Sequence, residues 1–81
     1  MTSMLEYIST REFKKGVVFL HQGDAPDFSY YLIKGCIRQF VIDENGREVT
    51  VNFYTDEESI NMFSFLDDEE MSLYNLSAIE D

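Results

Sequence analysis

The sequence predicts a mainly β fold: an antiparallel β-roll, jelly-roll-like (a double-stranded β-helix), with short flanking helices. Short runs rich in β-branched and aromatic residues recur along the chain, and glycines at positions 16, 23, 35 and 46 separate them. The composition is 44% hydrophobic and 15% aromatic, which supplies a core despite a net charge of −10. Eighty-one residues make at most one small domain, residues 1–81.

The first half of the chain predicts one short helix and a series of strands. In residues 4–8, Met4, Leu5 and Ile8 fall on one side of a helix, so we expect a short amphipathic helix there. The runs that predict strands are 17–20, 30–33, 36–42 and 49–54. The segment 23–27, with Pro26 to preset its φ, predicts a turn between the first two strands.

The clearest hairpin signal is "VIDENGREV", residues 41–49. Asn45-Gly46 can supply the two positive-φ residues of a type I′ turn, whose twist matches its flanking strands. After the turn, Val49, Val51 and Phe53 alternate with polar residues. The alternation predicts a strand with one buried face.

The last third predicts a helix followed by a strand. In residues 59–66, Ser59 is a plausible N-cap and apolar residues follow at three-residue steps, so a short helix is expected. The "DDEE" run at 67–70 lacks the alternate-residue spacing and central glycine of a calcium loop, which favours a solvated turn. Residues 74–78 alternate in polarity and predict a final strand.

The charge is unevenly placed along the chain. Residues 1–54 hold six bases against seven acids, whereas residues 55–81 hold nine acids and no base. Such a surface repels a polyanion, so we expect no nucleic-acid contact by this segment. No apolar run is long enough for a membrane span, and the single Cys36 fits a reducing cytoplasm.

No residue pattern predicts an enzyme, a metal site or a cofactor. His21 is the only histidine, and a structural hydrogen-bonded turn residue is the favoured interpretation over a metal or catalytic role. Cys36 stands alone, which argues against an iron–sulfur cluster and favours a small buried strand residue. No "GxSxG" nucleophile motif occurs.

Three segments in fixed order carry a family resemblance: "FKKGVVFLHQGD" (13–24), "YYLIKGCIRQFVIDENGREVTVNFY" (30–54) and the helix-then-strand tail. Together they resemble the effector domain of the Crp/Fnr transcription regulators, the cyclic-nucleotide-binding β-roll. The resemblance implies a partial effector domain over 1–81, incomplete at the C-terminus. The dimerisation helix and the helix-turn-helix DNA-binding domain of that family are absent from this chain.

The same resemblance implies where a cyclic nucleotide would bind, and the residues there differ. Family members hold the phosphate with a Gly-Glu pair, which falls at Asn61 and Met62, and an Arg-Ser pair, which falls at Ser72 and Leu73. None of the four positions matches, and no Lys or Arg follows Arg47. We therefore expect no response to cyclic AMP or cyclic GMP.

The sequence leads to one leading hypothesis and one alternative. The leading hypothesis is the effector-sensing portion of a Crp/Fnr-type regulator, with a small-molecule effector of unknown identity and DNA contacts in a missing C-terminal domain. The alternative is a stand-alone β-roll interaction module whose acidic tail contacts a basic partner. An uncovered strand edge predicts a homodimer or other self-association. The candidate ligand-pocket residues are Asn61, Met62, Phe63, Ser72, Leu73 and Tyr74.

Overall fold

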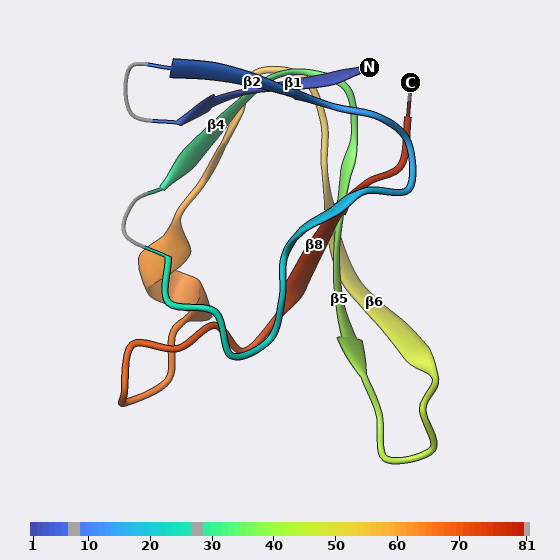
Figure 1. Ribbon diagram of the computed structural model, residues 1–81, viewed down its shortest axis with the longest axis vertical. Helices are drawn as coiled ribbons and strands as arrows, with labels where there is room; N and C mark the ends of the chain where they lie inside the picture. Colours follow the sequence, from blue (N-terminus) through green and yellow to red (C-terminus); the bar gives the residue numbers. More distant parts are fainter. Residues whose placement is uncertain (7–8, 27–28, 81) are drawn as a thin grey trace.

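Two antiparallel four-stranded sheets form the protein, which a computed structural model describes over residues 1–6, 9–26 and 29–80 (Figure 1). One sheet has the strand order β2-β1-β4-β7, and the other has the order β3-β8-β5-β6. The strands are β1 (Thr2–Glu6), β2 (Ser9–Phe13), β3 (Val18–Leu20), β4 (Tyr30–Lys34), β5 (Ile37–Ile42), β6 (Glu48–Tyr54), β7 (Glu58–Ile60) and β8 (Asn75–Ala78). A single turn of 3₁₀ helix, η1 (Met62–Phe65), follows β7. The predicted β-roll fold class is confirmed.

The core lies between the two sheets and takes residues from both. Its buried members are Met4, Leu20, Leu32, Ile37, Ile60, Met62, Phe65 and Leu76. Burial of apolar side chains at about 25 cal/mol per Å² is the main favourable term that holds the two sheets together. The described chain ends lie close together (Figure 1), and the Thr2 hydroxyl donates to the carbonyl of Glu80 at 3.2 Å.

The predicted helix over 4–8 is wrong for residues 4–6, and its last two residues lie outside the described residues. Those first residues belong to β1, which pairs with β2 on one side and β4 on the other. Met4 is fully buried and Leu5 half-buried, as strand alternation requires. Five residues are too few to separate a helical period from a strand, and pairing to two neighbours decides the outcome. Strand β2 was not predicted from the sequence.

Gly35, at the end of β4, makes room for the first strand. Its φ is +118°, and a Cβ built there would lie 2.6 Å from the Thr2 Oγ1 and 2.9 Å from the Thr2 Cα. The Gly35 N–H donates to the Asp56 carboxylate at 2.6 Å. Only glycine combines this backbone conformation with so close an approach.

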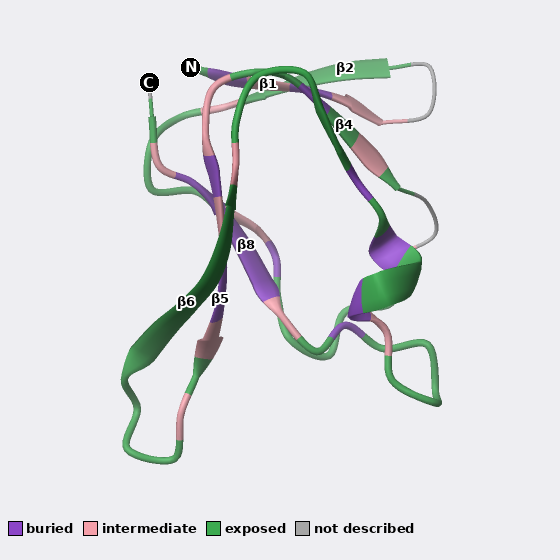
Figure 2. Cartoon of the chain, turned by 180° about the vertical axis from the view of Figure 1, so that it is seen from behind, coloured by how far each residue is buried: buried purple, intermediate pink, exposed green. Residues whose placement is uncertain are grey.

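Strands β3, β4, β5, β6 and β8 confirm the predicted runs to within one residue at most ends. The predicted burial of β6 is wrong, because Val49, Val51 and Phe53 are 43%, 49% and 53% exposed. Figure 2 shows β6 as exposed along nearly its whole length, at the edge of its sheet. Strand β6 lies at the edge of its sheet and pairs only with β5 among the described strands, so its side chains stay exposed.

The β5–β6 hairpin exists, but its turn differs from the predicted type I′. Gly46 has a φ of +80°, and Asn45 is not among the described residues with positive φ. The Gly46 N–H donates to the Asp43 carbonyl at 3.0 Å, and the Asp43 N–H donates to the Arg47 carbonyl at 2.8 Å. This pattern is typical of a type I turn followed by a glycine bulge, a three-residue loop. The Asp43 side chain favours it, since its carboxylate accepts the N–H groups of Asn45 and Arg47.

The predicted helix over 59–66 is also shorter than expected. Ser59 lies in β7 and is not an N-cap, and the helical turn begins at Met62 with Asn61 as its N-cap. Strand β8 is present, but its alternation is lost, because all four of its residues are buried. A strand between β3 and β5 that is covered on both faces has no solvent side. No helix in the described ranges is long and apolar enough to cross a membrane.

Candidate functional site

The resemblance predicts that a phosphate would bind first at residues 61–62, where η1 begins, and the backbone N–H groups of Met62, Phe63 and Ser64 already have acceptors. The Met62 N–H donates to the Ser29 hydroxyl at 3.1 Å, and the Phe63 N–H donates to the Asn61 side-chain oxygen at 3.0 Å. The Ser64 N–H donates to the Asn61 carbonyl at 3.3 Å. An anion at a helix N-terminus needs free N–H groups, and here the protein itself occupies them.

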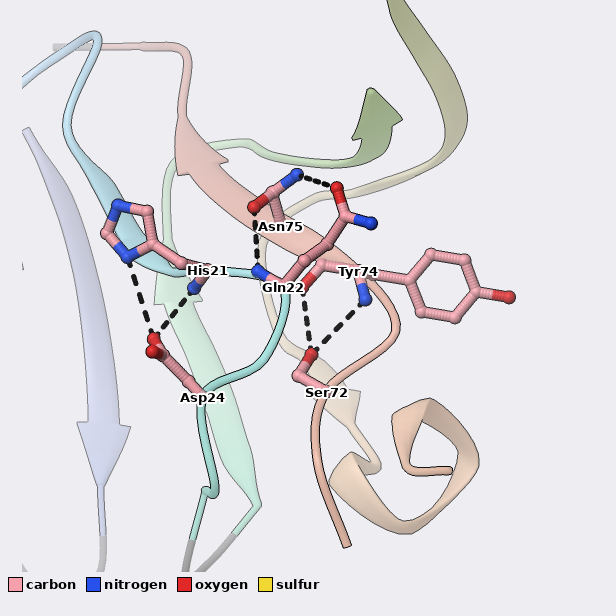
Figure 3. A network of polar contacts seen from close by, with 6 residues as sticks. All are labelled: His21, Gln22, Asp24, Ser72, Tyr74 and Asn75. Carbon is pink, nitrogen blue, oxygen red and sulfur yellow. Dashed lines mark hydrogen bonds and ion pairs between the residues drawn. The ribbon is translucent and has the colours of Figure 1, made fainter. Parts of the chain in front are cut away.

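The second half of this position is residues 72–74. Its backbone N–H groups also donate to acceptors within the protein, some of which Figure 3 shows. The Ser72 N–H donates to the Asp24 carbonyl at 2.7 Å, and the Leu73 N–H donates to the Phe65 carbonyl at 2.8 Å. The Ser72 hydroxyl accepts the Tyr74 N–H at 3.3 Å and donates to the Tyr74 carbonyl at 2.8 Å. Ser72 is buried, so its hydroxyl stabilises the local turn and does not face a ligand cavity.

A polar network fixes this turn against the segment after β3. The buried Asn75 side chain accepts the Gln22 N–H at 2.9 Å and donates to the Gln22 side-chain oxygen at 2.8 Å (Figure 3). The Asn75 amide also lies 3.4 Å from the Phe40 carbonyl. A buried amide with this many partners specifies one arrangement of β8, the segment after β3, and β5.

The six candidate pocket residues do not line one cavity. Met62 is 2% exposed and belongs to the core, whereas Phe63 is 82% exposed and Leu73 is 46% exposed. Tyr74 packs edge-on against Phe65, with ring centroids 5.3 Å apart. Asn61 lies at the border of a surface groove formed by β1, β4 and β7. Their role in ligand binding stays a prediction.

The acidic run 67–70 forms an ordered turn that repeats the geometry of the β5–β6 hairpin loop. The Asp67 carboxylate accepts the N–H groups of Glu69 and Met71 at 2.8 and 3.0 Å. The Glu70 N–H donates to the Asp67 carbonyl, and the Asp67 N–H donates to the Met71 carbonyl. Glu70 has a φ of +63°, where the equivalent residue of the hairpin is Gly46. The first carboxylate of the run, that of Asp67, therefore bonds to the backbone of its own turn.

The sequence drew attention to two side chains with reactive groups, His21 and Cys36. The contacts of His21 are those of a turn residue, and Cys36 lies just before a strand. His21 is a hydrogen-bonded turn residue, as predicted: its N–H donates to the Asp24 carboxylate, and its ring Nδ1 lies 3.5 Å from that carboxylate. Cys36 precedes β5 and is only half-buried, which corrects the prediction of a buried strand residue. Burial, and then the nearby carboxylates of Glu80, Glu58 and Asp56, raise the pKa of the Cys36 thiol. A thiol with a raised pKa is a weak nucleophile at neutral pH.

The comparisons with known proteins agree with this architecture. The family model described as "Cyclic nucleotide-binding domain" matches residues 10–81. The chain belongs to that family. A crystal structure of the Thermus thermophilus catabolite activator protein matches with a TM-score of 0.74 and 28% sequence identity, over 88% of this chain. The match covers 33% of the other chain, so this chain spans about one third of its length. No curated protein sequence matches the chain.

The domain is thus of the Crp/Fnr type, with a cyclic-nucleotide-binding-like β-roll. Strand β1 precedes the matched range 10–81, yet it lies in the middle of one sheet, between β2 and β4. The occupied N–H groups at 62–64 and 72–74 were not predictable from the sequence. Only the spatial arrangement reveals that Ser29 and Asp24 supply two of the acceptors.

Proposed function

We propose that this domain is the effector-sensing portion of a Crp/Fnr-type transcription regulator in the cytoplasm and that it does not respond to cyclic AMP or cyclic GMP. Family membership and the likeness to the catabolite activator protein support the regulatory role. DNA contacts then belong to another part of the protein, because residues 55–81 carry nine acids and no base.

The occupied phosphate position supports the lack of a nucleotide response most strongly. Binding a phosphate there would break the hydrogen bonds that Asn61, Ser29 and Asp24 make to the backbone. The bonds to Asn61 and Ser29 are exposed or part-buried, so each one lost costs about 0.5–1.5 kcal/mol unless the ligand replaces it. No cationic side chain follows Arg47 to supply the missing attraction.

Electrostatics oppose an anion at this position as well. The turn 67–70 contributes four carboxylates beside the candidate segments. A pair of like charges about 4 Å apart costs on the order of 1 kcal/mol in water and about 4 kcal/mol near a protein surface. The repulsion and the lost hydrogen bonds act in the same direction, so micromolar affinity is not expected.

Isothermal titration calorimetry tests the nucleotide claim. We expect no saturable heat when cyclic AMP or cyclic GMP is titrated into the chain up to millimolar concentration. Micromolar binding of either nucleotide to the unaltered chain would contradict the proposal.

The regulatory role has a separate test in the coding sequence that follows codon 81. We expect the reading frame to continue into a long helix and a basic helix-turn-helix. The alternative, an interaction module, draws support from the exposed apolar residues of β6. A stop codon after residue 81, together with capture of a basic peptide by the acidic surface, would favour that alternative over the regulator.

A further inference from the structure

Two adjoining hollows lie between strands β1, β2 and β4 of one sheet and strand β3 of the other. They share the lining residues Glu6, Arg11, Phe19 and Tyr30, and their volumes are about 260 and 340 Å³. Arg11 pairs with Met4 on β1, and Glu6 pairs with Tyr30 on β4. Because Met4 is fully buried, strand alternation places Glu6 and Arg11 on the face of the sheet that bears the core. We call the two hollows together the ion-pair pocket.

An ion pair stands where the two hollows meet. The Arg11 Nη1 lies 3.4 Å from the Glu6 Oε2 and 3.5 Å from the Glu6 Oε1. The Glu6 side chain is only 17% exposed, whereas that of Arg11 is 55% exposed. A guanidinium has five N–H donors, and the described contact with Glu6 uses one of its three nitrogens. Arg11 can therefore bind a second carboxylate at the border of the pocket.

Aromatic rings form one wall of the pocket. The rings of Phe13 and Phe19 are stacked with centroids 4.8 Å apart, and Tyr30 meets Phe19 edge-on at 5.8 Å. Val17 and Val18 complete this wall in the smaller hollow. Such rings pack favourably against an apolar or aromatic side chain of a ligand.

A second carboxylate, that of Asp24, lines the larger hollow from the segment after β3. It accepts the His21 N–H at 2.8 Å, as Figure 3 shows, and the Asp24 side chain is 49% exposed. Burial first, and then the charge of Glu6, raise the pKa of the Tyr30 hydroxyl. Arg11 lowers this pKa and Asp24 raises it, so all three charges lie close to the phenol. The pocket thus combines one cation, two carboxylates and an aromatic wall.

We propose that the ion-pair pocket binds an α-amino acid with an apolar side chain. The ligand's carboxylate binds Arg11, and its ammonium binds the carboxylates of Asp24 and Glu6. The ligand's side chain packs on the aromatic wall at Phe19. Such a zwitterion has no net charge, so the net charge of −10 does not repel it as it repels an anion.

The size of the pocket agrees with a ligand this small, since both volumes lie near the lower end of the range of small-molecule sites. The inference rests on the proposed sensor function, to which it adds the chemical class of the effector and a site outside the phosphate position.

The test uses the whole chain in an amide ¹H–¹⁵N correlation NMR titration with L-phenylalanine. We expect saturable shifts centred on the amides of Glu6, Arg11, Phe19 and Asp24. Three analogues each lack one of the recognised groups: N-acetyl-L-phenylalanine has no ammonium, 2-phenylethylamine has no carboxylate, and glycine has no apolar side chain. Each should bind at least tenfold more weakly than L-phenylalanine.

Two variants assign the carboxylate contact. Arg11→Gln should weaken L-phenylalanine at least tenfold but leave the binding of 2-phenylethylamine, which has no carboxylate, unchanged. Arg47→Gln, an exposed arginine in the β5–β6 loop, is the matched control and should change neither. The correlation spectrum establishes that each variant is folded, and the analogue series tests the proposal without any substitution.

The proposal is overturned if L-phenylalanine causes no saturable shifts, if any one analogue binds as tightly, or if the two arginine variants lose equal affinity. Shifts at residues 62–64 and 72–74 on adding cyclic AMP would instead contradict the proposed function, whatever the result with L-phenylalanine. The two failures are therefore distinguishable.

Discussion

Replacing Gly35 with alanine tests how closely the first strand packs against the end of β4. A Cβ at position 35 would lie 2.6–3.0 Å from three atoms of Thr2, and the φ of +118° adds backbone strain. Positive-φ strain costs about 1 kcal/mol, and overpacking adds about 2 kcal/mol. We expect Gly35→Ala to lower the free energy of unfolding by about 3 kcal/mol, a large part of the ~4–12 kcal/mol typical of a chain this size.

Gly46→Ala is the matched control, because its φ is +80° and no atom lies within 4 Å of the added Cβ. It should cost only the strain of about 1 kcal/mol. The difference of about 2 kcal/mol corresponds to roughly 10 °C in Tm, measured by far-UV circular dichroism and checked by urea unfolding. Adding Thr2→Gly to Gly35→Ala should recover part of the loss. Equal losses in the two glycine variants would refute the packing of β1 against Gly35.

Three further predictions follow from the turns, the buried amide and the thiol. Glu70→Gly should raise the free energy of unfolding by about 1 kcal/mol in urea melts, because glycine relieves the positive φ, and Glu69→Gly should not raise it. Asn75→Ala should lower it by about 2–3 kcal/mol, since Gln22 loses its partners, and a loss below 1 kcal/mol would contradict the network. Cys36 should react with iodoacetamide more slowly than glutathione at pH 8, because burial and nearby carboxylates raise the pKa of its thiol. The rate should rise only in more alkaline solution, and a faster reaction than glutathione would show the opposite shift.

Self-association is tested at the edge strand. Val51 is the unpaired residue where the β5–β6 register shifts, and it is 49% exposed. Among the described strands, β6 is the edge of its sheet. If the chain pairs through this edge, Val51→Lys should convert dimers to monomers in sedimentation velocity, whereas Ile33→Lys on the other sheet should not. Unchanged dimers in the Val51→Lys variant would place the contact elsewhere.

The sequence predicted the strands best where β-branched and aromatic runs are bounded by glycine. The run 36–42 became β5 with its glycine corner at Gly35, since local propensity and tertiary pairing favour the same state there. The prediction failed in residues 4–6 and 59–60. Segments of three to five residues fit both the helical and the strand period, and pairing with β4 makes these two segments strands. The hairpin turn was misassigned because the Asp43 carboxylate, rather than Asn45, selects the loop.

The position of the candidate site stays a prediction from the family resemblance. The spacing after Tyr54 assigns the altered Gly-Glu and Arg-Ser positions to 61–62 and 72–73, and the absence of bases was visible in the sequence. The acceptors that occupy the backbone come from Ser29 and Asp24, distant in the chain, so no local pattern announces them. The surface groove at β1, β4 and β7 was missed because its residues come from three strands, two of which, β1 and β7, overlap segments predicted as helices.

Titration of the chain with cyclic AMP, followed through the amide resonances of Met62, Phe63, Leu73 and Tyr74, tests the central claim most directly. These N–H groups have acceptors within the protein, so we expect them to keep their positions up to millimolar nucleotide. Saturable shifts of these four amides at micromolar cyclic AMP would contradict the claim that the protein's own hydrogen bonds occupy the phosphate position.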